Sequence, residues 1–129
     1  MIGATDPTQA AEGSLRARFL KDWEKLGLAE KPHIGANAVH ASAGPIEGLK
    51  ERMVWVGATI EGDAFGKRLL EKKDKAVVEW WMSNPMVHIT SDDDDDADDE
   101  GTVDRIFDVT ELMDTSDVLE NAPSYHTTV

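Results

Sequence analysis

The stretch GPIEGLKERMVWVG, from Gly44 to Gly57, is where the fold of this chain can be read most directly. Proline at the first position of a helix loses no hydrogen bond that the helix needs, so Gly44-Pro45 predicts a helix start. The apolar residues that follow recur at the helical period and share one face: Ile46, Leu49, Met53 and Val56. We therefore expect a helix with one apolar face, followed by a loop from Gly57 to Gly62.

Two more helices are expected after this loop. One begins after the N-cap residue Asp63, and the other runs from Lys75 to Met82, where Asn84-Pro85 stops it. Their apolar residues are Phe65, Leu69, Leu70, Val77, Val78, Trp81 and Met82. In the pair Trp80-Trp81 we expect one ring in the core and the other at its rim or on a partner surface.

The remaining elements are predicted to be short. Apolar residues at helical spacing favour a helix from Leu15 to Leu26, and the segment Asn37–Ser42 has some strand character. Toward the C-terminus, Val103–Val109 is a candidate short strand and Ser116–Glu120 a helical turn. The chain is thus expected to be mostly helical with little strand.

Composition excludes several classes of protein. The 129 residues include no Cys, which removes disulfides, thiolate catalysis and Cys-ligated zinc. No apolar run approaches the roughly 20 residues that a membrane-spanning helix needs. The N-terminus also lacks a basic stretch followed by an apolar one. We expect a cytoplasmic protein with one modest core and no membrane partner.

Acidity is concentrated toward the C-terminus. Residues 1–90 contain 12 acidic and 12 basic side chains, whereas residues 91–100 contain 8 acidic and no basic ones. A nucleic-acid binder would present a basic stripe, so no nucleic-acid partner is expected. The run SDDDDDADDE gathers like charge and has almost nothing apolar to bury, which predicts an acidic disordered linker at residues 91–101. Weak calcium binding and docking to a basic surface are its alternative roles.

The segment IGANAVHASAGPIE at residues 34–47 contains Asn37, His40 and Ser42. It resembles the active-site signature of the nucleoside diphosphate kinase family, in which an asparagine stands three residues before the nucleophilic histidine and a serine two residues after it. Two upstream blocks are also similar to the family, MIGATDP at residues 1–7 and GSLRARF at residues 13–19. The three blocks stand in the family's order.

The resemblance extends to the helix after the histidine and covers residues 1–57. Glu51 and Trp55 stand 11 and 15 residues after His40, where similar kinases place a glutamate and an aromatic residue. The family transfers the γ-phosphate of a nucleoside triphosphate such as ATP to this histidine, and then to a nucleoside diphosphate. Mg²⁺ is implied as the ion that bridges the nucleotide phosphates, with no metal-ligand set from the protein itself.

The resemblance assigns roles to six residues. His40, Ser42 and Glu51 are the implied catalytic residues, and the implied nucleotide- and phosphate-binding residues are Thr5, Arg16 and Asn37. Neutral imidazole is a good nucleophile near pH 7, and a carboxylate can fix its tautomer by accepting the proton on the other ring nitrogen.

Simpler roles stay open for the same residues. Arg16 can instead be a solvated residue on the surface of its helix. Glu51 can form an ion pair along its own helix, and Thr5 can cap the turn that leads to Pro7. His33 and His126 have no ligand partners at metal-binding spacing and receive no role.

The implied fold class is α+β, a partial nucleoside diphosphate kinase-like (ferredoxin-like) half-domain at residues 1–57. A helical extension at 58–90, the acidic linker at 91–101 and a C-terminal tail at 102–129 follow it. The resemblance starts inside the family domain, and Ala43 stands where the family has an aspartate. Because a lone strand needs a sheet, we expect residues 58–129, another protein subunit or an upstream segment to cover the half-domain.

An alternative function belongs to a different class. It is a catalytically degenerate kinase-like subunit with a structural or docking role in a larger assembly. The helices between residues 63 and 83, with Trp80 and Trp81, would then be its partner-binding face. Domains similar to this one recur in cilia and flagella, which adds a cilium or flagellum to the expected locations.

Overall fold

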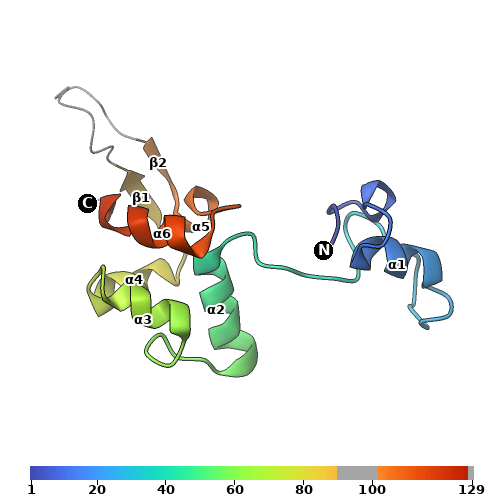
Figure 1. The fold of residues 1–129 in the computed structure, drawn as a ribbon, viewed down its shortest axis with the longest axis horizontal. Helices are drawn as coiled ribbons and strands as arrows, with labels where there is room; N and C mark the ends of the chain where they lie inside the picture. Colours follow the sequence, from blue (N-terminus) through green and yellow to red (C-terminus); the bar gives the residue numbers. More distant parts are fainter. Residues whose placement is uncertain (90–101, 128–129) are drawn as a thin grey trace. The chain divides into compact units, whose positions relative to one another are not determined.

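The chain divides after Ala41 into two units, Met1–Ala41 and Ser42–Val129, in the computed structural model. Residues 1–89 and 102–127 are described by the structure, so the predicted acidic linker lies outside the described residues. Over the described residues the chain is α+β and mostly helical, with six α-helices and one three-stranded antiparallel sheet (Figure 1).

The first unit contains one α-helix, α1 (Leu15–Asp22), and a short 3₁₀-helix, η1 (Pro7–Gln9). Ser14 begins α1 because its hydroxyl accepts a hydrogen bond from the backbone N–H of Ala17 at 3.3 Å. The predicted helix therefore starts where expected but ends before Leu26.

The strand character expected for Asn37–Ser42 is not realised. Within the described residues of the first unit, the one strand-like pairing is an isolated bridge between His33 and Ala36. The backbone of Ala38 has a φ of 65°, which interrupts an extended conformation. Without a neighbouring strand, the segment stays irregular.

The three central helices of the second unit agree with the sequence prediction. They are α2 (Pro45–Val56), α3 (Ala64–Leu70) and α4 (Lys75–Trp81). Pro45 occupies the first turn of α2, and Gly57 ends this helix in the left-handed conformation with a φ of 67°.

Only the first part of the predicted apolar face of α2 reaches the core. Ile46 and Leu49 are fully buried, and Met53 packs against the core from its edge. Val56, on the same predicted face, is 75% exposed. Val54 and Trp55 are exposed as well, which shows that the last turn of α2 extends past the core of this unit.

Asp63 connects α2 to α3 through its carboxylate. Its Oδ1 accepts hydrogen bonds from the backbone N–H groups of Phe65 and Gly66, which confirms the predicted cap. Arg52 on α2 donates to both carboxylate oxygens, at 2.7 and 3.0 Å. Arg52, more than the two backbone N–H groups, lowers the pKa of Asp63 below its ordinary value of 3.8.

The second unit contains more strand than the sequence predicts. Its strands are β1 (Met86–Ile89), β2 (Thr102–Arg105) and β3 (Tyr125–Thr127), in the order β2-β1-β3, with both neighbours antiparallel to β1. The predicted strand at 103–109 is instead divided between β2 and a short helix, α5 (Ile106–Val109). The turn before β1 holds the start of α5, where the strand gives way to a helix. Asn84 Oδ1 and the Pro85 carbonyl accept hydrogen bonds from backbone N–H groups of α5.

The core of the second unit joins helices to this sheet. The helical turn expected at 116–120 is a longer helix, α6 (Thr115–Asn121). Trp81 is fully buried and meets Tyr125 edge-on, with ring centroids 6.0 Å apart. Trp80 is partly buried against the same core, so the expected division between a core ring and a rim ring is confirmed. The other buried apolar residues of this core are Ile46, Leu49, Ile60, Phe65, Leu69, Val78, Met82, Val87, Ile106, Val118, Leu119 and Ala122.

Gly66→Ala is expected to lower the free energy of unfolding by about 2 kcal/mol, because a Cβ there would lie 2.2 Å from the Ile60 carbonyl oxygen. Gly48→Ala is the matched control, since its Cβ would meet the flexible end of Arg52 at 3.3 Å. Alanine is also favoured over glycine inside a helix, so this control is expected to be neutral or stabilising. Urea denaturation of both variants measures the difference, and equal stabilities would contradict the packing described.

Asp63→Asn is expected to cost about 1 kcal/mol at pH 7, since it keeps an oxygen for the cap but removes the charge that binds Arg52. A carboxylate with a lowered folded pKa stabilises the protein above its unfolded pKa, and this contribution is lost as the pH falls through the folded pKa. The wild type should therefore lose more stability than the variant between about pH 5 and about pH 2. Asp74→Asn serves as the control, because the Asp74 side chain makes no cap hydrogen bond. Parallel pH profiles for wild type and Asp63→Asn would count against the pairing.

Candidate functional site

Arg16 ties together three separate parts of the first unit. Its side chain is only 9% exposed, and its Nη1 donates to the Gly3 carbonyl at 2.8 Å. Its Nη2 donates to the Val39 carbonyl at 3.0 Å. The backbone N–H of Arg16 also donates to the Ile2 carbonyl at 2.9 Å. The guanidinium thus holds the residue that directly precedes His40.

Gly3 lets the N-terminal segment approach α1 closely. Its φ is 99°, a conformation that favours glycine, and a Cβ built there would lie 2.5 Å from the hydroxyl of Ser14. Ser14 is itself buried and caps α1. Gly3 of the first block is therefore required, because Ser14 of the second block leaves no room for a side chain there.

Asn37 makes a second connection to the N-terminal segment. Its Nδ2 donates to the backbone carbonyl of Thr5 at 3.2 Å, while the Thr5 side chain is exposed. His40 follows three residues later and is exposed. The predicted residues Thr5, Arg16, Asn37 and His40 all belong to this one unit.

The other two predicted residues, Ser42 and Glu51, contact each other in the second unit. The Ser42 hydroxyl donates a hydrogen bond to Glu51 Oε2, and both residues are half-buried. The pair lies beside Gly48, where an added Cβ would make an ordinary 3.5 Å contact with the Ser42 hydroxyl oxygen. The carboxylate is therefore held by its own helix and by the segment that leads into it.

The start of α2 is fixed by backbone contacts within the second unit. The Ala43 carbonyl accepts a hydrogen bond from Leu112 at 3.0 Å, and its N–H donates to Glu47 at 2.6 Å. A Cβ on Gly44 would lie 2.3 Å from the Thr110 carbonyl oxygen. Only glycine fits at this approach, so Gly44-Pro45 is both a helix start and a packing contact.

The six predicted residues therefore form two local arrangements. In the first unit, Arg16 and Asn37 bind backbone carbonyls around Thr5 and Val39. In the second unit, Ser42 binds Glu51. Two of the N–H groups on the Arg16 guanidinium are used in this way, and its buried Nε has no hydrogen-bond partner in the described part of the chain.

Some contacts could not be found from the sequence. The carbonyls of Gly3 and Val39 are backbone atoms, and the only sequence signal for them is the glycine in the first block. The register of the sheet also places His126 directly opposite His88. These histidines are too far apart in the sequence for a spacing pattern to relate them.

Within residues 1–89 and 102–127, no group of three or more His, Asp or Glu side chains is arranged to hold a metal ion. Among those same residues, no helix combines the length and the apolar character needed to cross a membrane. Comparison of the chain with protein-family models, curated proteins and solved structures found no match.

Ser42→Ala is expected to lower the free energy of unfolding by about 1–2 kcal/mol, because it removes a hydrogen bond to a half-buried carboxylate. Ser116→Ala is the control, since Ser116 is exposed and its hydroxyl makes only a 3.4 Å contact with Asp117. Urea denaturation followed by circular dichroism compares the two. Equal stabilities would mean that the Ser42–Glu51 hydrogen bond contributes nothing.

Proposed function

We propose that this chain has a nucleoside diphosphate kinase-like function, with phosphoryl transfer from a nucleoside triphosphate to a nucleoside diphosphate through His40. The observation that supports it best is the meeting of the three sequence blocks. Arg16, from the second block, binds the Gly3 carbonyl of the first and the Val39 carbonyl of the third. Asn37, from the third block, binds the Thr5 carbonyl of the first. Residues that resemble one family's motifs are thus also neighbours in space.

The proposed reaction has two steps. An imidazole nitrogen of His40 attacks the γ-phosphorus, and the bond from this phosphorus to the oxygen of the β-phosphate breaks, so that the diphosphate leaves with that oxygen. A second nucleoside diphosphate then attacks the phosphohistidine and regenerates the imidazole. The exposure of His40 is compatible with access by a nucleotide.

Arg16 is proposed to position His40 and to add positive charge beside it. By holding the Val39 carbonyl, it restricts the backbone immediately before the histidine. A guanidinium has five N–H donors, and one on Nη1 and one on Nη2 bind carbonyls here. Nε is buried, so the second N–H of Nη1 and of Nη2 are the donors proposed to bind a phosphate oxygen. Thr5 and Asn37 are proposed to contact the phosphate or sugar of the same nucleotide.

Glu51 is proposed to act as a catalytic carboxylate, and the Ser42–Glu51 pair supports this proposal. The Ser42 hydroxyl holds the carboxylate in one orientation within the second unit. Mg²⁺ is proposed to arrive bound to the nucleotide phosphates, where it neutralises the charge that develops during transfer. A cytoplasmic setting, which includes a cilium or flagellum, belongs to this proposal.

A docking role is the second candidate function, and exposed apolar residues at the end of α2 favour it. Trp81 is fully buried, so it does not form the partner-binding face predicted from the sequence. Val54, Trp55 and Val56 are exposed instead, and Trp55 is 78% exposed. We propose that another protein subunit covers this end of α2.

Incubation with γ-labelled ATP and Mg²⁺ is expected to produce an acid-labile phosphate on the chain that added nucleoside diphosphate removes. His40→Ala should abolish the label, because it removes the nucleophile. His33→Ala is the matched control, since His33 is an exposed histidine of the same unit and should leave the label unchanged. Absence of label on folded wild-type protein would contradict the phosphotransfer proposal and leave the docking role.

A further inference from the structure

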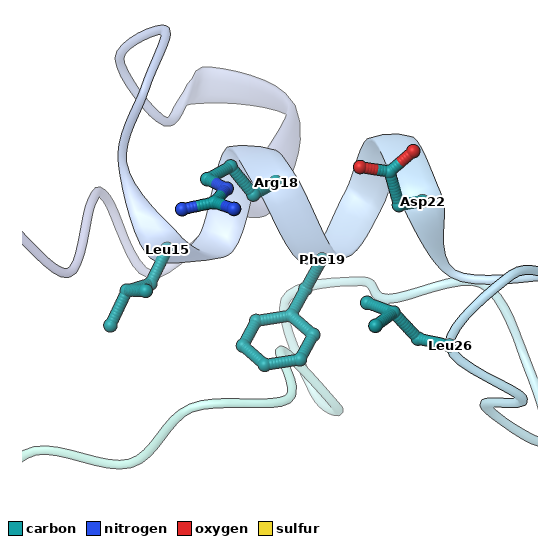
Figure 2. Close-up of a pocket in the computed structure, with 5 residues that line it drawn as sticks. All are labelled: Leu15, Arg18, Phe19, Asp22 and Leu26. Atoms are coloured by element: carbon teal, nitrogen blue, oxygen red, sulfur yellow. The ribbon is translucent and has the colours of Figure 1, made fainter.

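An apolar groove runs along one face of α1 in the first unit. It encloses about 220 Å³ and is lined by Leu15, Arg18, Phe19, Asp22 and Leu26. Figure 2 shows the Phe19 ring between the side chains of Leu15 and Leu26, with Arg18 and Asp22 on the helix beside them. The face therefore combines three apolar side chains with one basic and one acidic group.

This face is poorly covered within its own unit. Leu15 is 43% exposed, Leu26 is 53% exposed and Phe19 is only partly buried. The buried residues of the unit are prolines or polar residues: Pro7, Ser14, Arg16 and Pro32. A unit of about 40 residues normally needs a disulfide, a metal or association to be stable, so exposed apolar side chains on its one α-helix call for a partner.

The charge distribution indicates what kind of partner fits. Residues 1–41 contain 5 acidic and 5 basic side chains, whereas residues 42–129 contain 21 acidic and 8 basic ones. Two copies of the chain would repel each other through their second units but not through the first. The neutral first unit is thus the part through which copies of this chain can associate.

We propose that the α1 face docks against the same face of a second copy, with the two helices antiparallel about a two-fold axis. Arg18 and Asp22 stand one helical turn apart, so a two-fold axis places Arg18 of each copy against the partner's Asp22. It also brings the Leu15 end of each groove to the Leu26 end of the other. In the described part of the chain Arg18 makes no ion pair, and Lys25 occupies only Oδ1 of Asp22, at 2.9 Å. The second carboxylate oxygen remains to accept from the partner's Arg18.

The test is the oligomeric state of the full chain, measured by sedimentation equilibrium up to about 1 mM. Wild type should form a concentration-dependent dimer. Arg18→Asp alone and Asp22→Arg alone should each weaken it by about tenfold or more, because both pairs of the dimer then bring like charges together. Lys21→Asp changes the charge of the same helix outside the groove lining and should leave the dimer intact.

Mixing the two single variants provides the decisive comparison. A copy with Arg18→Asp and a copy with Asp22→Arg present opposite charges at both pairs, so the mixture should form a heterodimer of near wild-type affinity. If each substitution weakened the dimer only by changing its own helix, mixing the two variants would not restore the affinity. Wild type that stays monomeric, a dimer unaffected by either reversal, or a mixture no tighter than its components would each overturn the proposal.

Discussion

The guanidinium of Arg16 is the interaction on which the first unit depends. This unit has almost no buried apolar side chain, so hydrogen bonds must hold its segments together. One buried cation binds the carbonyls of Gly3 and Val39, which lie 36 residues apart in the sequence. Removal of a partner from a buried charged group is costly, because the charge is then left without compensation. The position of the backbone before His40 follows from this single side chain.

The second unit is stabilised in a different way. Helices α2 to α6 bury apolar side chains together with β1 and β3, and Trp81 and Tyr125 join the helical and sheet parts. Gly44 and Gly66 allow backbone to pack on backbone at two helix starts. The pair Ser42–Glu51 rests on this core, through the first turns of α2.

Local signals in the sequence predicted the local structure well. Asp63 caps α3, Pro45 starts α2 and Asn84-Pro85 ends the region of α4, because each depends on residues only a few positions away. The sheet could not be predicted in this way, since β1 pairs with strands that lie beyond residue 101 and near residue 126. Val56 fits the helical period but lies past the edge of the core, which periodicity alone does not reveal.

The candidate site likewise has a part that the sequence predicts and a part that only the structure shows. The spacing of Asn37, His40, Ser42 and Glu51 predicts their chemical roles, and these roles stay predictions. The hydrogen bond between Ser42 and Glu51 is seen only in the structure. The structural role of Arg16 could not be predicted from the sequence. Its hydrogen-bond partners are backbone carbonyls, and every residue has one. The self-complementary face of α1 could also not be predicted from the sequence, because the sequence does not show which apolar side chains stay exposed.

The most direct test of the central claim is a titration of the labelled chain with Mg²⁺ and a nucleoside diphosphate, followed residue by residue by NMR. If the residues gathered around Arg16 bind nucleotide phosphates, the backbone amides of Thr5, Asn37 and His40 should shift together and saturate with one affinity. The amides of Val87 and Tyr125, in the sheet of the second unit, should stay unchanged. Shifts confined to the sheet, or no shifts at millimolar nucleotide, would contradict the account.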